Sequence, residues 1–341
     1  MTRSTAFFIN GGAGRVLTSI PAFELYEKEN PEDNFIIVCE GGTDFYKGHP
    51  TLHNRAYDHW HKGLFEEYIK DRNCVTPEPY RVWEYYNQKC SLAQAFDITI
   101  NNNGLRKVNN PVLTLNKQEV VTGANIVDEV RQHTGKEKVI VVQPFGRTTE
   151  AIGDFIIDAT SRSFQLNNIV EIINILKKEY GVIIMSEIPV PLEEKENTKY
   201  PVAQPQISDI RAWAGIIECA DHFLGCDSLG QHIVKALGKS ATIITGSTYP
   251  VNVSYIDDSK FDIIDVGYGK RVYAPIRLTM EEEQDRQNDE VMEMSAEHIK
   301  QVCDSVRKVL GTSKKKALDP AQAPKLQIGT STIKSPFGER K

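Results

Sequence analysis

The feature that most constrains the fold is the alternation of short apolar runs with amphipathic segments along the chain. Apolar, β-forming runs at 5–10 and 35–40 flank a segment with helical spacing at 20–31. The same alternation returns over 138–186 and over 209–246. Near-continuous apolar strands that alternate with helices are typical of parallel sheets covered by helices on both faces. The sequence therefore predicts an α/β protein.

The length of 341 residues is sufficient for two such sheets. A polar break at 132–138 (QHTGKEK) separates the first set of elements from the second. We expect two Rossmann-like domains facing a central cleft, followed by a tail. The expected bounds are 1–135 for the N-terminal domain, 136–311 for the C-terminal domain with a return helix, and 312–341 for the tail.

The charge is distributed unevenly along the chain. The whole sequence has a net charge of −6, whereas residues 312–341 contain seven basic and two acidic side chains. The sequence favours a flexible tail, because this segment lacks apolar periodicity and cannot offset its ordering entropy. Such a tail either keeps the protein in solution or contacts the phosphates of a nucleic acid or an anionic lipid.

Composition excludes several other classes of protein. No apolar run reaches the roughly 18 residues that span a bilayer, and the N-terminal segment is too short for a signal peptide. The six cysteines lack C-x-x-C spacing, so neither disulfides nor a zinc site are expected. We expect a cytoplasmic protein without stable membrane insertion.

A glycine-rich loop, NGGAGRV, follows the first expected strand at 10–16. Glycines permit tight turns, and unpaired N–H groups at the start of a helix attract anions. Leu17 occupies the third glycine position of a dinucleotide-binding fingerprint, which disfavours a nicotinamide site. The loop is either a structural turn or a wall of the cleft that contacts donor or acceptor.

A second polar turn opens the segment CDSLGQHIVKALGKSATIITGSTYP at 226–250. It places Asp227, Ser228 and His232 at the start of a helix, and a Gly-x-Thr-x-Pro turn follows the next strand. The positive end of a helix dipole stabilises the charge of a diphosphate. The alternatives are an ordinary helix cap for Asp227 and Ser228 and a core histidine for His232.

This segment resembles the signature of the ADP-heptose:lipopolysaccharide heptosyltransferase family. That signature is an Asp-Ser/Thr-Gly-x-x-His turn, a helix ending Ala-Leu-Gly-Lys/Arg, a strand and Gly-x-Thr-x-Pro. Leu229 departs from the signature, and Gly230 comes one position later than the family glycine. Residues 12–23 are similar to the family's first loop and helix, with Arg15 at the position of the acidic residue that serves the family as catalytic base. A weaker likeness extends over 5–310.

The resemblance implies a GT-B fold and an inverting glycosyltransferase with its nucleotide-sugar on the C-terminal domain. It also implies arginine contacts to the diphosphate from QPFGR and SRSF, and a ribose contact from MSEIPVP. No metal and no cofactor is required if these donors suffice. The implied donor-binding residues are Gly12, Gly14, Arg15, Arg147, Arg162, Glu187, Asp227, Ser228, Gly230, Gln231, His232, Gly246 and Thr248.

An inverting transfer needs a group that removes the proton of the acceptor hydroxyl. Arg15 cannot accept a proton at neutral pH. The remaining carboxylates at strand ends and loops of the N-terminal domain are Glu40, Asp44 and Glu78. We expect Glu40 to be the base, because it ends the second strand, where parallel sheets place ligand-contacting residues.

Aromatic and basic residues alternate at 47–63 and 78–89. They form either an aromatic core with a solvated basic face or an acceptor groove, in which rings stack on a base or sugar. Four histidines lie at 47–63 with spacings that match no standard metal site. The candidate acceptor-binding residues are Tyr57, Trp60, Tyr80 and Arg81.

The chain as a whole also resembles heptosyltransferase-like proteins of tailed bacteriophages, some of which glycosylate hydroxylated cytosine in DNA. Together with the basic tail, this favours double-stranded DNA as acceptor, in the host cytoplasm if the protein is phage-encoded. A lipopolysaccharide or other saccharide acceptor is the alternative. Two further alternatives are a nucleotide-sugar epimerase and a non-catalytic saccharide-binding protein.

Overall fold

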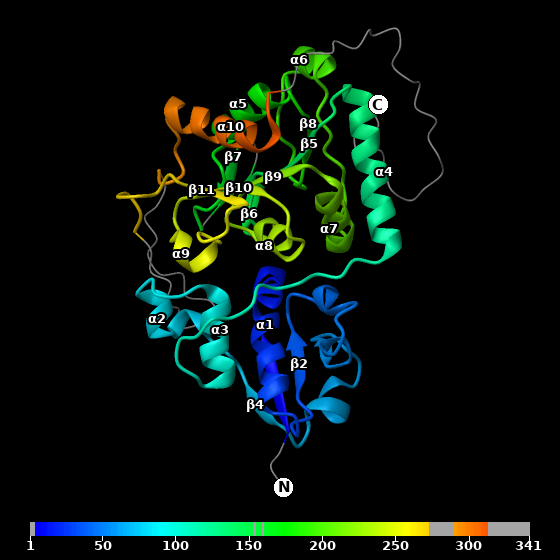
Figure 1. Cartoon of the computed structure of the whole chain (residues 1–341), viewed down its shortest axis with the longest axis vertical. Helices are drawn as coiled ribbons and strands as arrows, with labels where there is room; N and C mark the ends of the chain where they lie inside the picture. The colour runs from blue at the N-terminus through cyan, green and yellow to red at the C-terminus, as the bar shows by residue number, and fades with distance from the viewer. Residues whose placement is uncertain (1–3, 153–154, 159, 273–289, 313–341) are drawn as a thin grey trace.

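The computed structural model describes residues 4–152, 155–158, 160–272 and 290–312. Two layered halves lie one above the other, each with helices packed around a parallel sheet (Figure 1). This arrangement confirms the predicted α/β class with two parallel sheets. No helix within the described ranges is long and apolar enough to cross a bilayer.

The first half is built on a four-stranded parallel sheet in the order β3-β2-β1-β4. Helix α1 begins at Ala13, inside the glycine-rich segment 10–16, and so starts seven residues before the helical segment expected at 20–31. Pro21 lies inside this helix. The elements are β1 (Thr5–Ile9), α1 (Ala13–Glu29), β2 (Ile36–Cys39), β3 (Ala56–Asp58), β4 (Asn73–Val75), α2 (Trp83–Tyr86) and α3 (Leu92–Asn101).

The second half is built on a five-stranded parallel sheet in the order β11-β10-β9-β5-β8. Helix α10 packs on α5 and on this sheet, and α4 packs against α7 (Figure 1). The strands are β5 (Val139–Gln143), β8 (Gly181–Ile184), β9 (His222–Cys226), β10 (Ala241–Thr245) and β11 (Phe261–Asp265). The helices are α4 (Lys117–Thr134), α5 (Leu166–Leu176), α6 (Glu194–Lys199), α7 (Ile210–Cys219), α8 (Leu229–Ala236), α9 (Pro250–Val253) and α10 (Ala296–Leu310).

A two-stranded antiparallel hairpin interrupts the second half. It consists of β6 (Thr149–Ile152) and β7 (Phe155–Asp158), with Thr149 paired to Asp158. The sequence analysis did not predict it. The hairpin separates β5 from α5 and brings the loops at 146–149 and 160–163 together at its base.

The chain passes from the first half to the second in the extended segment 102–116 (Figure 1). Helix α4 follows this segment and packs with the second half, whereas the predicted domain boundary at 132–138 lies at the end of this helix. Residue 312 is the last described residue, so nearly all of the predicted basic tail lies outside the described residues.

Two buried polar contacts join the halves. Arg211 of α7 donates to the Asp44 carbonyl of the first half at 3.1 Å, and within the second half it binds both carboxylate oxygens of Glu119 in α4, at 2.8 and 2.6 Å. Asn252 of α9 donates to the carbonyls of Tyr85 and Cys90 at 2.9 and 2.8 Å. One apolar core also continues from β1 and α1 into the second sheet. The halves therefore meet through a specific packed interface.

Candidate active site

A cavity of about 970 Å³ lies between the halves, and both halves contribute to its walls. Its lining residues follow the carboxyl ends of β1, β2, β5, β8, β9 and β10. Loops at this edge of a parallel sheet are the usual ligand-binding positions, because no helix covers the edge itself. The fold therefore gathers residues that are up to about 240 positions apart in the sequence around one cavity.

The first-half wall is the glycine loop and the start of α1. Gly12 is the N-cap of α1, and no acidic residue lies in the first turn, so the positive end of the helix faces the cavity without a carboxylate from the helix itself. A Cβ added at Gly41 would lie 2.5 Å from the Ala13 nitrogen, so only glycine allows the end of β2 to approach this loop. Glu40 Oε2 accepts a 2.5 Å hydrogen bond from the Gly11 N–H, which holds the carboxylate at the cavity wall.

Arg15 lines the cavity beside Tyr80. Its guanidinium lies over the Tyr80 ring, 4.9 Å from the centroid, and Nη2 is 3.7 Å from Glu78 Oε1. Glu78 is therefore paired with a cation, and it is not among the cavity-lining residues. Two buried nitrogens of Arg15, Nε and Nη2, have no hydrogen-bond partner among the residues that the structure describes. This part of the wall combines a cation with an aromatic face.

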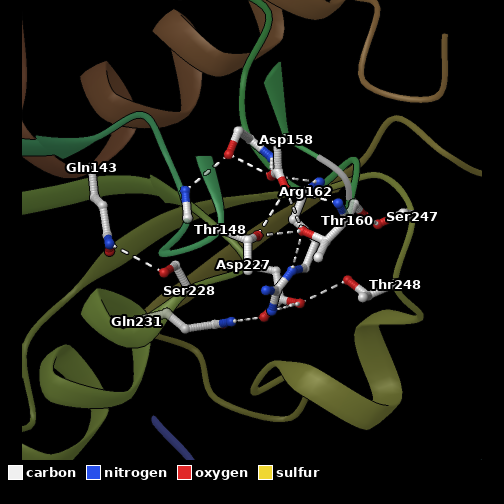
Figure 2. A network of polar contacts seen from close by, with 12 residues as sticks. Gln143, Thr148, Asp158, Thr160, Arg162, Asp227, Ser228, Gln231, Ser247 and Thr248 are labelled. Atoms are coloured by element: carbon white, nitrogen blue, oxygen red, sulfur yellow. Dashed lines mark hydrogen bonds and ion pairs between the residues drawn. The ribbon is translucent and has the colours of Figure 1, made fainter. Parts of the chain in front are cut away.

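The start of α8 is capped by a residue from a neighbouring strand. Gln143, at the end of β5, accepts a 2.9 Å hydrogen bond from the Gly230 N–H and donates to Ser228 Oγ at 3.2 Å (Figure 2). A Cβ at Gly230 would lie 2.3 Å from both Gln143 Oε1 and Phe223 Cζ. The glycine at 230 is thus explained by helix–sheet packing, and its N–H is already bound within the protein.

Asp227 is buried at the end of β9 and still borders the cavity. Its carboxylate accepts from Gln231 Nε2 at 2.7 Å and Thr248 Oγ1 at 2.9 Å, and Arg162 Nη1 lies 4.0 Å away (Figure 2). Burial raises the pKa of this carboxyl, while Arg162 and the two hydrogen bonds oppose the increase. The Asp227 carboxylate therefore connects the start of α8 to the turn after β10.

His232 lies on α8 where the starts of α1 and α8 meet (Figure 1). A Cβ added at Gly14 would lie 3.6 Å from His232 Cδ2. His232 Nδ1 is 2.8 Å from the Tyr255 hydroxyl. Burial, with a smaller contribution from Arg162, lowers the pKa of His232 to about 4. The imidazole is therefore neutral at physiological pH and borders the cavity as a hydrogen-bonding group.

Two more arginines enter the cavity from the loops beside the hairpin. Arg162 Nε donates to Thr160 Oγ1 at 3.0 Å, and the Arg162 side chain is 30% exposed. Arg147 reaches toward the first half: a Cβ added at Gly12 would lie 3.1 Å from Arg147 Nη1. Together with two helix starts, these guanidiniums make the centre of the cavity suitable for an anion.

A less polar recess continues from this centre along the end of β8. Its walls include Met185, Ile188, Ile207 and Trp213, with Glu187 on the loop after β8. Gln204 Nε2 donates to the carbonyls of Ser186 and Ile188, at 3.0 and 2.7 Å, and so fixes the shape of this loop. An apolar recess beside an anion-binding centre has the character of a nucleotide site.

Comparison with solved structures identifies this architecture. The structure of E. coli ADP-heptose LPS heptosyltransferase II superposes with a TM-score of 0.59 at 10% identity, over 90% of this chain and 98% of that chain. A family 9 glycosyl transferase from Veillonella parvula gives 0.54 at 10% identity, over 77% and 86%. The glycosyltransferase TibC of enterotoxigenic E. coli gives 0.52 at 10% identity, over 91% and 77%.

The fold is GT-B. At 10% identity these likenesses establish the fold alone. No protein-family model and no curated protein sequence matches the chain. The predicted fold class is confirmed.

The GT-B cleft brings together most of the residues selected from the sequence. Ser228 and Thr248 border it with Asp227 on the second-half side, and Tyr80 does so on the first-half side. The predicted residues that line the cavity are Gly12, Gly14, Arg15, Glu40, Tyr80, Arg147, Arg162, Glu187, Asp227, Ser228, His232 and Thr248. Their assigned roles stay predictions.

The other predicted residues lie outside the cavity lining. Asp44 is in a short helical turn and binds Lys47 at 2.6 Å. Tyr57 packs on Tyr68 with ring centroids 4.3 Å apart, and Trp60 is 82% exposed beyond the edge strand β3. The full set is Asp44, Tyr57, Trp60, Glu78, Arg81, Gly230, Gln231 and Gly246.

Gly230, Gln231 and Gly246 were predicted to contact the donor, and the structure gives each a packing or orienting contact instead. Gln231 is fully buried and donates to Asp227. A Cβ at Gly246 would lie 2.3 Å from the sulfur of Met292, so this glycine allows close packing.

Four residues that support the site were not selected from the sequence: Gln143, Thr148, Asp158 and Tyr255. Gln143 is a polar residue at the end of a buried apolar strand, which is the signal that selected Glu40. The other three have no comparable local signal, because their partners are brought to them by the hairpin and by α8.

Proposed function

We propose that the protein is a glycosyltransferase that transfers a sugar from a nucleoside-diphosphate sugar to an acceptor hydroxyl with inversion. The observation that carries the proposal is the anion-binding centre of the GT-B cavity, where Arg162, His232 and the start of α8 converge beside an apolar recess. The structural neighbour TibC has been solved in complex with ADP-D-β-D-heptose, which supports a donor of this class.

The second half would bind the donor. The diphosphate would lie at the start of α8, between Arg162 and Arg147, with the nucleoside in the recess beside Glu187. As the bond from the anomeric carbon to the diphosphate breaks, its electron pair leaves with the diphosphate. The guanidiniums and helix N–H groups stabilise that developing charge. Neutral His232 can contribute a hydrogen bond in either direction.

The first half would bind the acceptor, with Glu40 as general base. The acceptor oxygen forms a bond to the anomeric carbon as the diphosphate leaves, and its proton passes to the Glu40 carboxylate. Asp44 is outside the cavity lining and Glu78 is paired with Arg15, so Glu40 is the best placed of the three candidates. The Tyr80 ring beside Arg15 offers a stacking face for the acceptor.

The acceptor remains the hydroxylated cytosine of double-stranded DNA that the sequence resemblance favours, with a lipopolysaccharide or other saccharide as the alternative. The aromatic residues Tyr57 and Trp60 lie outside the cavity lining, so a DNA acceptor would be recognised through Tyr80, Arg15 and the basic tail.

The test is release of nucleoside diphosphate from a panel of ADP-, UDP- and GDP-linked sugars. Each donor is incubated with hydroxymethylcytosine duplex, the matching cytosine duplex, a lipopolysaccharide core fragment or no acceptor. Release with one acceptor, together with mass spectrometry of the glycosylated product, supports the proposal and names the acceptor. Release with the hydroxymethylated duplex and not with the cytosine duplex favours DNA.

The same panel separates the alternatives. An epimerase would convert the free donor to an isomeric sugar nucleotide without acceptor, visible by chromatography. A saccharide-binding protein would leave every donor intact. Either result overturns the transferase proposal.

A further inference from the structure

Asp158 is the centre of a hydrogen-bond network at the base of the hairpin (Figure 2). Its Oδ1 accepts from Thr148 Oγ1 at 3.0 Å and from the N–H and hydroxyl of Thr160 at 2.8 and 2.6 Å. Its Oδ2 accepts from the Arg162 N–H at 3.2 Å and from the N–H and hydroxyl of Ser163 at 2.9 and 2.6 Å. Each oxygen thus accepts three hydrogen bonds.

The carboxylate stays ionised across the physiological range. Burial alone would raise its pKa, but the hydrogen bonds from Ser163 and Thr160, with the charge of Arg162, lower the pKa of Asp158 to about 2. Six donors around a permanent negative charge make a rigid junction, since charge-assisted hydrogen bonds are the stronger kind.

The network links the two cavity arginines that come from different loops. Thr148 adjoins Arg147, and Ser163 Oγ also accepts from the Gly146 N–H at 2.9 Å, so residues on both sides of Arg147 are tied to the junction. Arg162 is tied through its own N–H and through Thr160, which its Nε contacts at 3.0 Å. Ser247 Oγ donates to the Thr160 carbonyl at 2.7 Å and joins the turn before Thr248 to the same junction.

We propose that Asp158 is a positioning residue that holds Arg147 and Arg162 together in the arrangement that binds the donor diphosphate. The inference rests on the proposed function of the cavity. Asp158 itself is absent from the cavity lining, whereas both arginines are in it. The carboxylate therefore acts through the arginines, and its removal costs diphosphate affinity by loosening them.

The first experiment measures the Kd of ADP and of inorganic pyrophosphate by calorimetry in a double-mutant cycle. Thr148→Val removes the link between Asp158 and the Arg147 loop, and we expect a loss of about two- to tenfold in affinity for both probes. Because that loss acts through Arg147, Thr148→Val should change nothing further in an Arg147→Ala protein. Full additivity of the two variants overturns the proposal, since it means that Thr148 acts independently of Arg147.

The second experiment replaces Asp158, the residue at the centre of the network. Asparagine fits the space of Asp158 but has only one acceptor oxygen. Its NH₂ group takes the place of the other oxygen and faces three hydrogen-bond donors that it cannot accept from. We expect Asp158→Asn to weaken both probes about tenfold or more. The matched control is Asp221→Asn: Asp221 accepts from the Val139 N–H, Lys138 and Arg131 at the amino ends of β5 and β9, outside the cavity lining. It should lose stability and keep its affinity.

The outcomes separate this inference from the proposed function. Wild-type protein that binds neither ADP nor pyrophosphate contradicts the function of the cavity and with it this inference. Wild-type binding with equal affinity in folded Asp158→Asn protein contradicts the positioning role alone. If Asp158→Asn does not fold, the Thr148→Val cycle decides.

Discussion

At the residue scale, Arg162 is one of the two arginines that we propose bind the donor diphosphate. Its Nη1 is 4.0 Å from Asp227 Oδ2 and its side chain borders the cavity. We expect Arg162→Ala to weaken donor binding by roughly 10–150-fold, because a charge-assisted contact is worth about 1.5–3 kcal/mol. Donor titration checks the value. Arg131→Ala, which removes a cation remote from the cavity, should bind the donor normally; unchanged binding by Arg162→Ala would remove this residue from the site.

Glu40 carries the prediction for the chemical step. Its carboxylate is held by the Gly11 N–H at the cavity wall, where it can meet an acceptor hydroxyl. We expect Glu40→Gln to keep donor affinity and lower turnover about 10²–10⁴-fold, the usual contribution of a general base. Steady-state kinetics with the acceptor that the donor and acceptor panel identifies provides the measurement. Asp44→Asn is the control, and turnover near wild type in Glu40→Gln would assign the base to another group.

At the element scale, the start of α8 depends on a glycine. A Cβ at position 230 would lie 2.3 Å from Phe223 Cζ, a ring carbon within the sheet, whereas one at Gly14 meets His232 at an ordinary 3.6 Å. We expect Gly230→Ala to lower the free energy of unfolding by about 1–3 kcal/mol, as overpacked cores do. Urea denaturation checks this. Gly14→Ala should unfold near the wild-type midpoint, and equal midpoints for both variants would refute the packing explanation.

At the scale of the whole molecule, two buried histidines make stability depend on pH. Burial lowers the pKa of His222 and of His232 to about 4. The unfolded chain takes up these protons near pH 6.5. The stabilisation is complete above that pH and falls as the pH decreases toward 4, by up to about 1.4 kcal/mol per pH unit for each histidine. Burial raises the pKa of Asp227, so the folded state favours its neutral form. Asp227 therefore opposes the loss of stability in acid.

Urea midpoints between pH 7 and pH 4.5 measure that slope. His222 is hydrogen-bonded to Ser240 and Thr242 in the sheet, away from the cavity lining. The variant His222→Asn therefore tests the contribution of a buried histidine to this slope without altering the site. The variant should show a shallower decline in acid than the wild-type protein. Exposed His61→Asn should keep the wild-type slope. A wild-type midpoint that does not decrease toward acid would contradict the sign of the prediction.

The sequence alone determined the α/β class, the apolar strands β1, β2, β5, β8, β9 and β10, and several cavity residues at strand ends. It did not predict the sheet strands β3, β4 and β11, and it placed the start of α1 seven residues too late. The predicted elements follow from local signals: apolar runs mark β1, β5 and β9, helical spacing marks α5 and α10, and small polar residues mark the loops at 10–16 and 226–232. Because ligand-contacting residues follow the carboxyl ends of parallel strands, and two such sheets were expected to face one cleft, Glu40 and Asp227 could be assigned to a common cleft from the sequence.

Only the tertiary structure decided which partners surround those residues. Gly230 and Gly246 have the residue type of a phosphate-binding turn, yet Phe223 and Met292 occupy the space beside them. Glu78 is paired with Arg15, Tyr57 belongs to the edge strand β3, and Trp60 lies exposed just after it. The Asp158 junction depends on partners from two loops that the hairpin brings together. Residue type and spacing specify a group's chemistry and its position along an element, whereas its partners are set by packing between segments distant in sequence.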